Sequence, residues 1–276
     1  MPNPIITAAL TGPVATKADN AGMPGSVAEI AADAKACHEA GAAVIHIHLR
    51  DDQGSMTADL DVARRTVAAV REVCPGITQL STGGLQFTYE QRMALVEARP
   101  AMATLNPCTM TFGAAEFKNP PKQMMELAAR MIELGVKPEV EIYDTGHLDM
   151  MLYLLHKELL VEPLQVSFVM GVRGGMRGDP QLLSWLVREL PEGTSWQVIA
   201  VAKANLPMTT IGLAMGGNAR TGMEDTLTLS KGVPAASNLQ LVERLVGIAH
   251  SMQLEPATVP EVIERLKLHP ELVSGA

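Results

Sequence analysis

The stretch AVIHIHLRDD, residues 43–52, decides how the rest of the chain is interpreted. It is an apolar run of strand length that carries two histidines two positions apart. Alternate side chains of a strand share a face, so Val44, His46 and His48 are predicted on one face, and the aliphatic residues between them on the other. The aliphatic face suits packing against helices. The two imidazoles then either bind one metal ion or are core histidines that hydrogen-bond to their neighbours.

Strand-like apolar runs alternate with helical patterns from one end of the chain to the other. The predicted strands cover residues 5–10, 43–49, 77–81, 101–106, 139–143, 164–170, 195–202 and 218–220. The predicted helices cover residues 26–41, 59–73, 89–97, 122–134, 147–159, 180–190, 208–215, 237–252 and 258–268. Strands that alternate with helices imply parallel pairing and right-handed crossovers. Eight such units in about 250 residues predict the α/β class and a closed (β/α)8 TIM barrel.

No linker or low-complexity segment interrupts this pattern. We therefore expect one domain over residues 1–276, a barrel with an extra C-terminal helix. An open dinucleotide-binding sheet is disfavoured because no GxGxxG follows the first strand. Two capping-box patterns, Ser26 with Glu29 and Ser237 with Gln240, predict where two of the helices begin.

Composition narrows the class of partner. The chain has 276 residues, with 22 lysines and arginines against 30 aspartates and glutamates, and a net charge of −8. Without a basic run, this balance disfavours nucleic acid and anionic membranes. No apolar stretch approaches the about 20 residues of a membrane span, and the first residues do not resemble a signal peptide. Three scattered cysteines are too few for a disulfide framework. We expect a cytoplasmic protein that acts on small molecules.

Polar residues gather where the predicted strands end, which is where TIM-barrel active sites lie. The candidates are the turn Ser81-Thr82-Gly83-Gly84, Thr104, Asn106, Glu141, Asp144, the Gly-rich segment 171–178, Lys203, Asn205, Arg220, Glu224 and Asp225. The turn at Ser81 either binds an anion through hydroxyl and N–H donors or is an ordinary strand–helix turn. Arg220 and Asp225 form either a pair that tunes a carboxylate base or a surface ion pair. Cys108 is a nucleophile candidate without an evident partner.

The motifs that hold these residues resemble the β-keto acid cleavage enzymes. The resemblance covers nearly the whole chain and rests on TGPVATKADN, HIHLRDDQG, STGG, MATLNPCT, VKPEVEIYD, MGGNARTGMED and SKGVPAASN, in that order. It implies a (β/α)8 fold, a homotetramer, and a divalent metal, normally zinc, held by His46, His48 and Glu224. Two histidines and a carboxylate also suit non-haem iron by ligand type.

The same resemblance implies roles around the metal. It makes Asp225 the general base and Arg220 its partner. Ser81 and Thr104 would contact the substrate carboxylate, and Glu141 would be a polar pocket residue. We also include the rest of the turn, Thr82, Gly83 and Gly84, and Asn106 among the predicted substrate-binding residues.

The family reaction converts a β-keto acid and acetyl-CoA into acetoacetate and a new acyl-CoA. The resemblance implies that the metal acidifies the C2 protons of the keto acid and that Asp225 removes one of them. The enolate attacks the acetyl thioester, whose oxyanion needs hydrogen-bond donors. Coenzyme A leaves, adds to the original ketone, and a retro-Claisen cleavage frees acetoacetate.

The sequence departs from the family pattern at Val14. Members that act on amino-bearing substrates carry an acidic residue in a GAEVTK-like segment, whereas this chain has GPVATK. Valine cannot pair with an ammonium group, so we predict an apolar or small neutral substrate tail. Arg173, Arg177 and Lys203 are predicted to contact either coenzyme A phosphates or an acidic tail.

Two other functions stay open at this point. A metal-dependent hydrolase on the same fold would release free acid without acetyl-CoA, although many such hydrolases carry HxH on the first strand rather than the second. A non-catalytic binding protein on a decayed barrel would be unaffected by changes at His46 or Asp225. His147, just after the fifth strand, is a further candidate metal ligand that would replace Glu224.

Overall fold

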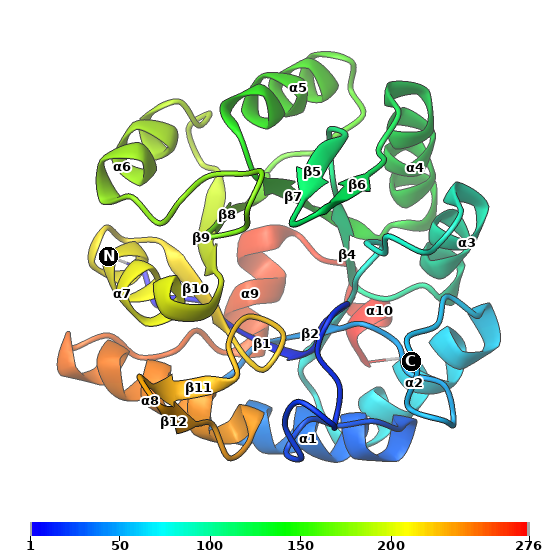
Figure 1. The fold of residues 1–276 in the computed structure, drawn as a ribbon. Helices are drawn as coiled ribbons and strands as arrows, with labels where there is room; N and C mark the ends of the chain where they lie inside the picture. The colour runs from blue at the N-terminus through cyan, green and yellow to red at the C-terminus, as the bar shows by residue number, and fades with distance from the viewer. Residues whose placement is uncertain (1, 275–276) are drawn as a thin grey trace.

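Eight parallel strands form a closed barrel in the computed structural model of the protein, which describes residues 2–274. Neighbouring strands follow the order β1-β10-β9-β8-β7-β4-β3-β2. The strands are β1 (Ile6–Thr11), β2 (Val44–Ile47), β3 (Ile77–Leu80), β4 (Met102–Leu105), β7 (Lys137–Ile142), β8 (Gln165–Met170), β9 (Ser195–Ala200) and β10 (Asn218–Thr221). The predicted (β/α)8 barrel is confirmed, and in Figure 1 its helices surround the strands.

A helix follows each barrel strand. These helices are α1 (Val27–Glu39), α2 (Leu60–Val73), α3 (Tyr89–Ala94) with the 3-10 helix η1 (Leu95–Ala98), α4 (Pro121–Leu134), α5 (Thr145–His156), α6 (Pro180–Arg188), α7 (Asn205–Ala214) after the 3-10 helix η2 (Ala202–Ala204), and α8 (Asn238–Ser251). Two more, α9 (Val259–Leu266) and α10 (Pro270–Ser274), follow the last unit. Within residues 2–274 no helix is both long enough and apolar enough to cross a membrane.

Two short hairpins were not predicted from the sequence. β5 (Met110–Phe112) pairs with β6 (Ala115–Phe117), and β11 (Thr228–Ser230) pairs with β12 (Val233–Pro234). Strands of two or three residues are too short to show an alternating pattern, which explains why they were missed. Both hairpins lie in loops that follow barrel strands, at the end of the barrel where the candidate residues gather.

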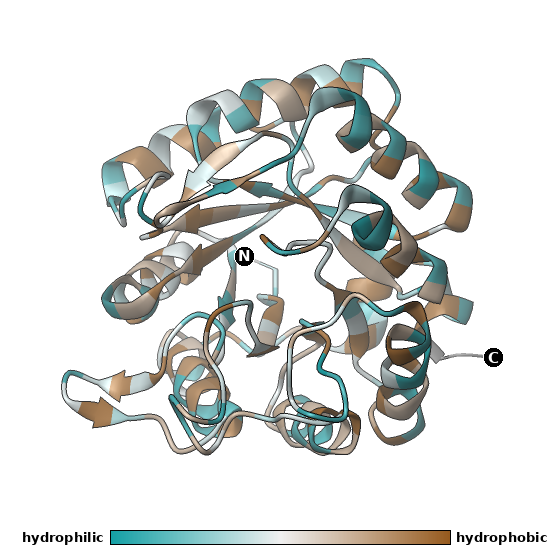
Figure 2. Ribbon diagram, turned by 45° about the vertical axis from the view of Figure 1, so that its right-hand side comes forward, coloured by the Kyte–Doolittle hydropathy of each residue, from teal (hydrophilic) through white to brown (hydrophobic). Residues whose placement is uncertain are grey.

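The two faces of β2 behave as the alternation predicts. Ile45, Ile47 and Leu49 are buried in one apolar cluster with residues of α1 and α2. His46 and His48 occupy the opposite face, away from those helices. Figure 2 shows that the surrounding helices carry hydrophilic and hydrophobic residues side by side, as expected for helices with one face on a barrel. The outside of the barrel is therefore an ordinary apolar layer.

Helix α9 covers the amino end of the barrel. Val262 and Leu266 are fully buried and share an apolar cluster with Ile5, which precedes β1. The N–H of Ala257 donates to the carbonyl of Pro4 at 2.9 Å, which ties the segment before α9 to the start of the chain. In Figure 1, α9 lies behind the ring of strands. The opposite, carboxyl end of the barrel carries the loops.

The predicted capping boxes are only half formed. Ser26 and Ser237 each accept a hydrogen bond from the N–H three residues later, as predicted. The Glu29 side chain, however, accepts from the N–H of Gly25, one residue before the cap, and Gln240 does the same at its helix. The helices begin where the sequence predicts. The hydrogen bond from the Glu29 or Gln240 side chain goes to the N–H one residue before the cap, instead of to the N–H of the cap itself.

Asp33 of α1 provides a test of the packing of α1 against α8. Its Oδ2 accepts a 2.7 Å hydrogen bond from Asn238 Nδ2, and burial raises the pKa of Asp33 from 3.8 to about 6. The pKa in the folded state lies above that of the unfolded chain. Protonated Asp33 therefore stabilises the fold at low pH, and this contribution is lost as pH rises through about 6.

We expect Asp33→Asn, which stays neutral and keeps an acceptor for Asn238, to gain stability over the wild type as pH rises. The gain in unfolding free energy should reach up to about 3 kcal/mol between about pH 4 and pH 7. Urea unfolding at several pH values measures it. Asp52→Asn, at a side chain that is 71% exposed, is the matched control. A difference between Asp33→Asn and the wild type that is constant with pH would contradict the account.

Candidate functional site

Two imidazoles and a carboxylate converge at the carboxyl end of the barrel. His46 lies on β2, His48 directly follows it, and Glu224 lies in the loop after β10. One ligand atom from each lies within 4.8 Å of the others. Glu224 Oε2 is 3.1 Å from His46 Nε2, and Glu224 Oε1 is 3.5 Å from His48 Nε2. The three predicted metal ligands therefore form one cluster.

Two glycines allow Glu224 to reach β2 across the intervening strand β1. A Cβ on Gly12 would lie 2.6 Å from Glu224 Cγ, and a Cβ on Gly222 would lie 2.0 Å from the carbonyl oxygen of Ala9. The N–H of Glu224 donates to that same Ala9 oxygen at 3.3 Å. The loop after β10 can therefore lie directly on the end of β1 only because both positions lack a side chain.

The cluster fits a divalent cation. His46 Nε2 and Glu224 Oε2 are buried and have no hydrogen-bond partner, although they face each other. His46 Nδ1 contacts the amide oxygen of Gln79 at 2.7 Å. Because this oxygen only accepts, Nδ1 carries the hydrogen, and in the neutral ring Nε2 has a lone pair that faces Glu224. One ring nitrogen from each of His46 and His48, together with the Glu224 carboxylate, forms a ligand set that suits zinc or iron.

Arg220 and Asp225 form a two-pronged ion pair beside this cluster. Arg220 Nε donates to Asp225 Oδ2 at 3.1 Å, and Nη2 donates to Asp225 Oδ1 at 2.7 Å. The same Nη2 donates to Glu224 Oε1 at 2.9 Å. Arg220 and Asp225 are both 3% exposed, so the alternative of a surface ion pair does not hold. The guanidinium fixes the orientation of Asp225 and ties it to Glu224.

Burial and nearby positive charge act in opposite directions on the pKa of these carboxyl groups. It raises the pKa of Asp225 and of Glu141 above their usual values, against the lowering effect of Arg220. At Glu224, Arg220 and the two imidazoles together outweigh burial and hold the pKa well below its usual range. Three carboxyl groups thus surround one guanidinium in a buried region, which favours the addition of a cation.

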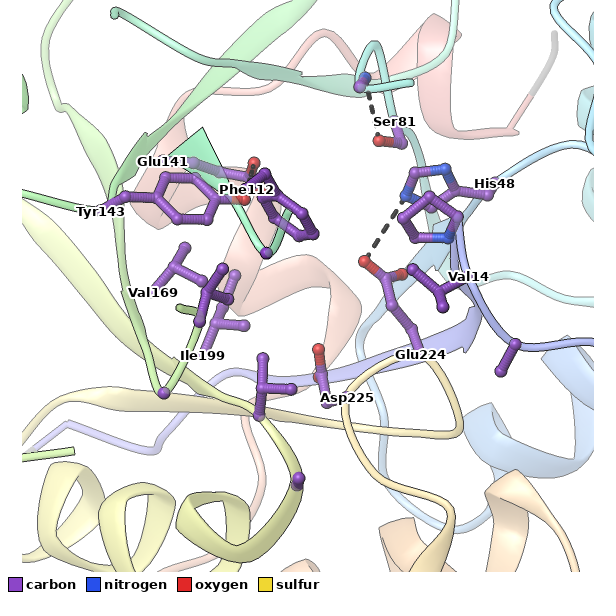
Figure 3. A pocket seen from close by; sticks show the side chains of 18 of the residues that line it. Val14, His48, Ser81, Phe112, Glu141, Tyr143, Val169, Ile199, Glu224 and Asp225 are labelled. Carbon is purple, nitrogen blue, oxygen red and sulfur yellow. Dashed lines mark hydrogen bonds and ion pairs between the residues drawn. The ribbon is translucent and has the colours of Figure 1, made fainter. Parts of the chain in front are cut away.

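A cavity of about 530 Å³ opens beside the cluster. Figure 3 shows Glu224 pointing toward the ring of His48, with Asp225 next to it and apolar side chains on the opposite side. Asn106, which is 2% exposed, lines the cavity with both polar atoms of its amide unpaired. Arg220 Nη1 also makes no hydrogen bond, although it lies 3.9 Å from Glu141 Oε1. Buried polar groups without partners are costly, so these are points where a bound substrate would be held.

The turn after β3 only partly agrees with its predicted role. Ser81, Gly83 and Gly84 line the cavity. Thr82 Oγ1 instead donates to the carbonyl of Thr104 at 2.7 Å, and the N–H of Thr82 donates to Thr104 Oγ1 at 3.0 Å. Neither threonine is among the described residues that line the cavity. Their contacts hold the turn against β4 rather than face a ligand.

The other wall of the cavity includes residues that the sequence analysis missed. Tyr143 donates its hydroxyl hydrogen to Glu141 Oε2 at 3.1 Å. Its spacing of two from Glu141 on a strand was a usable signal. Phe112 and Phe117, from the hairpin β5–β6, had none because the hairpin itself was not predicted. Val14 lies at the rim and is 75% exposed.

Two alternative candidates lie outside this arrangement. His147 Nδ1 accepts from the N–H of Tyr143 at 3.4 Å, and His147 is not part of the group of potential metal ligands found among the described residues. Cys108 Sγ lies 3.8 Å from the carbonyl of Gly146, and burial raises the pKa of its thiol. Glu224 therefore remains the better third ligand, and the raised pKa of Cys108 disfavours the thiolate that a nucleophile needs.

The three cationic loop residues are placed differently. Arg173 lines the cavity. Arg177 is 88% exposed and pairs with Asp179 at 3.4 Å, while Lys203 is exposed beside the cavity residue Ala202. Of the three, Arg173 is the one in direct reach of a ligand in the cavity.

Comparison with known sequences identifies the family. The sequence profile of the beta-keto acid cleavage enzymes matches residues 4–268. The chain belongs to this family. Among its relatives is the 3-keto-5-aminohexanoate cleavage enzyme of Acetoanaerobium sticklandii, which is 39% identical over 95% of this chain and 97% of that enzyme. The 3-oxoadipate:acetyl-CoA acetyltransferase of Cupriavidus necator is 31% identical over 98% of this chain and 97% of that one.

A solved structure supports the fold of this beta-keto acid cleavage enzyme family member. The apo structure of ObcA superposes with a TM-score of 0.78 and 19% identity. The match covers 90% of this chain and 66% of the ObcA chain, slightly under two thirds of its length. At this identity the likeness concerns the barrel alone.

We expect the protein to bind one divalent cation per chain, measured by elemental analysis and by competition with a chelator. His46→Ala and Glu224→Ala should each remove a ligand and weaken binding by at least about 10-fold, because a first ligand contributes more than its outer partners do. His147→Ala is the matched control and should bind as the wild type does. Metal binding lost in His147→Ala but kept in Glu224→Ala would show that the ligand set is wrong.

Proposed function

We propose that this protein is a metal-dependent β-keto acid cleavage enzyme that converts a β-keto acid and acetyl-CoA into acetoacetate and a new acyl-CoA. The observation that carries the proposal is the cluster of His46, His48 and Glu224 beside the Arg220–Asp225 pair, in a cavity large enough for a small ligand. Membership in the family supports it, as do relatives named for keto acids and for acetyl-CoA.

Each residue of the site has a separate role in the proposed reaction. A divalent cation, which we propose to be zinc, would supply Lewis acidity that makes the C2 protons of the keto acid removable. Asp225 accepts a C2 proton, and its raised pKa makes it a stronger base than an exposed aspartate. Arg220 holds the Asp225 carboxylate in place through two hydrogen bonds.

Polar groups of the cavity would hold the two substrates. In this proposal, Ser81 binds the keto-acid carboxylate through its hydroxyl and Gly84 binds it through its backbone N–H. The unpaired amide nitrogen of Asn106 is a free donor for the thioester oxygen, where negative charge develops. Arg173 would contact coenzyme A. We also propose a homotetramer, as the family resemblance implies, and a cytoplasmic location, because free cysteines suit a reducing compartment.

The activity is tested with a set of β-keto acids and acetyl-CoA, with acetoacetate and acyl-CoA followed by mass spectrometry. We expect both products in equal amounts. Asp225→Asn should lower kcat by about 100-fold or more, because it removes the base, while bound metal is unchanged. An exposed carboxyl, Asp61, which is 86% exposed, provides the control Asp61→Asn. Release of free acid without any need for acetyl-CoA would instead indicate a hydrolase.

The cavity walls support a neutral substrate tail. Val14, Phe112, Val169 and Ile199 present apolar groups to the cavity. The carboxyl group of Glu141 is already engaged by Tyr143 at 3.1 Å. Asp225 and Glu224 are paired with Arg220. No carboxylate among the described lining residues is therefore free to pair with an ammonium group in the tail.

We expect kcat/KM for 3-ketohexanoate to exceed that for 3-keto-5-aminohexanoate. Val14→Glu should shift this ratio toward the amino compound by up to about 5-fold, the size of an exposed ion pair, whereas the uncharged Val14→Gln should not. A wild-type preference of tenfold or more for the amino compound would refute the proposed tail.

A further inference from the structure

The barrel interior beneath the metal ligands is polar. The interior of a TIM barrel is usually filled by branched apolar side chains. Six polar side chains from six different strands, each at most 1% exposed, form a layer here: Thr7, His46, Gln79, Glu139, Ser167 and Gln197. Polar residues in such a place need partners, and these residues supply them for one another.

Hydrogen bonds join this layer to the predicted metal ligand. His46 Nδ1 bonds to Gln79 Oε1 at 2.7 Å, and Gln79 Nε2 donates to Glu139 Oε2 at 2.9 Å. Gln197 Nε2 donates to the same Glu139 oxygen at 3.0 Å and to Ser167 Oγ at 2.8 Å. The layer is thus a continuous chain of bonds that starts at His46 and crosses the barrel.

The chain has a fixed polarity. A carboxylate oxygen only accepts, so the two amide groups that meet Glu139 must present their nitrogens to it. Once Gln79 faces Glu139 with Nε2, its oxygen necessarily faces His46. That oxygen also only accepts, so His46 must carry its hydrogen on Nδ1. In the neutral ring the opposite nitrogen, Nε2, is then free of hydrogen, and it faces Glu224.

We propose that Gln79 and Glu139 are positioning residues that hold His46 in the one neutral tautomer able to bind a metal ion through Nε2. They reach the metal centre only through His46. The proposal rests on the metal site of the proposed function. It assigns a role to the buried carboxyl group of Glu139, which takes no direct part in the reaction. Gln197 and Ser167 keep the Glu139 side chain in place from the far side of the barrel.

Two variants test the proposal in the full-length protein. Gln79→Met has a similar shape but leaves Nδ1 of His46 without an acceptor. Glu139→Gln keeps the volume, yet its amide can present either oxygen or nitrogen to Gln79, so the polarity is lost. We expect each to weaken zinc binding by about 10- to 100-fold, measured by competition with a chelator. Gln165→Met removes another buried barrel glutamine, whose side-chain oxygen has no hydrogen-bond partner, and should bind zinc as the wild type does.

A second measurement separates positioning from general weakening of the fold. In metal-free protein labelled with nitrogen-15 in histidine, at a pH high enough for the His46 ring to be neutral, the ring should show hydrogen on Nδ1 alone. In Glu139→Gln and Gln79→Met it should show a mixture of the two tautomers, with Gln165→Met unchanged. A merely structural role would alter the unfolding midpoint without altering the tautomer.

The outcomes distinguish the two proposals. Wild-type tautomer and wild-type zinc affinity in both variants would overturn the positioning role, whatever the enzyme's activity. A wild-type protein that binds no divalent cation would overturn the metal site of the proposed function. In that case, a single Nδ1-protonated tautomer of His46 in the wild type and a mixture of tautomers in Glu139→Gln would still support control of the tautomer by the buried layer.

Discussion

The burial of several charges at one end of the barrel is the constraint on which the rest of the site depends. Glu141, Glu224 and Asp225 lie around a single guanidinium, that of Arg220, and little of this group is exposed. Coulomb interactions are strong in such a region, and an uncompensated charge there is expensive. Arg220 cannot neutralise three carboxyl groups. The two imidazoles beside Glu224 complete a site where a divalent cation would balance the remaining charge.

The barrel has apolar side chains on the outside of its strands and polar side chains on the inside. Outside the strands, aliphatic residues such as Ile45 and Ile47 pack against helices, and α9 covers the amino end. Inside, a polar layer reaches from His46 to Gln197. At the carboxyl end, Gly12 gives the backbone access that brings Glu224 over β1. We therefore expect a substitution in the interior layer to alter the proposed metal site from a distance, and one on the outer face to alter mainly stability.

Features set by local periodicity could be predicted from the sequence. The two-residue repeat in β2 predicted which face of the strand His46 and His48 occupy, and the eight strand–helix units predicted the barrel. Contacts between distant residues could not be predicted in this way. Gln79 hydrogen-bonds to His46, which is 33 positions away in the sequence, and to Glu139, which is 60 positions away. No spacing rule connects these residues. Thr82 and Thr104, predicted as substrate contacts from their residue types at strand ends, form hydrogen bonds with each other, and no spacing rule indicated that contact either.

The most direct test of the central claim is a crystal structure of the zinc-loaded protein, with anomalous scattering measured at the zinc absorption edge. The account predicts one strong peak between the side chains of His46, His48 and Glu224, at about 2.0–2.2 Å from each ligand atom, with room left for substrate. A peak elsewhere in the chain, or a structure in which these three side chains turn away from one another in the presence of zinc, would contradict it.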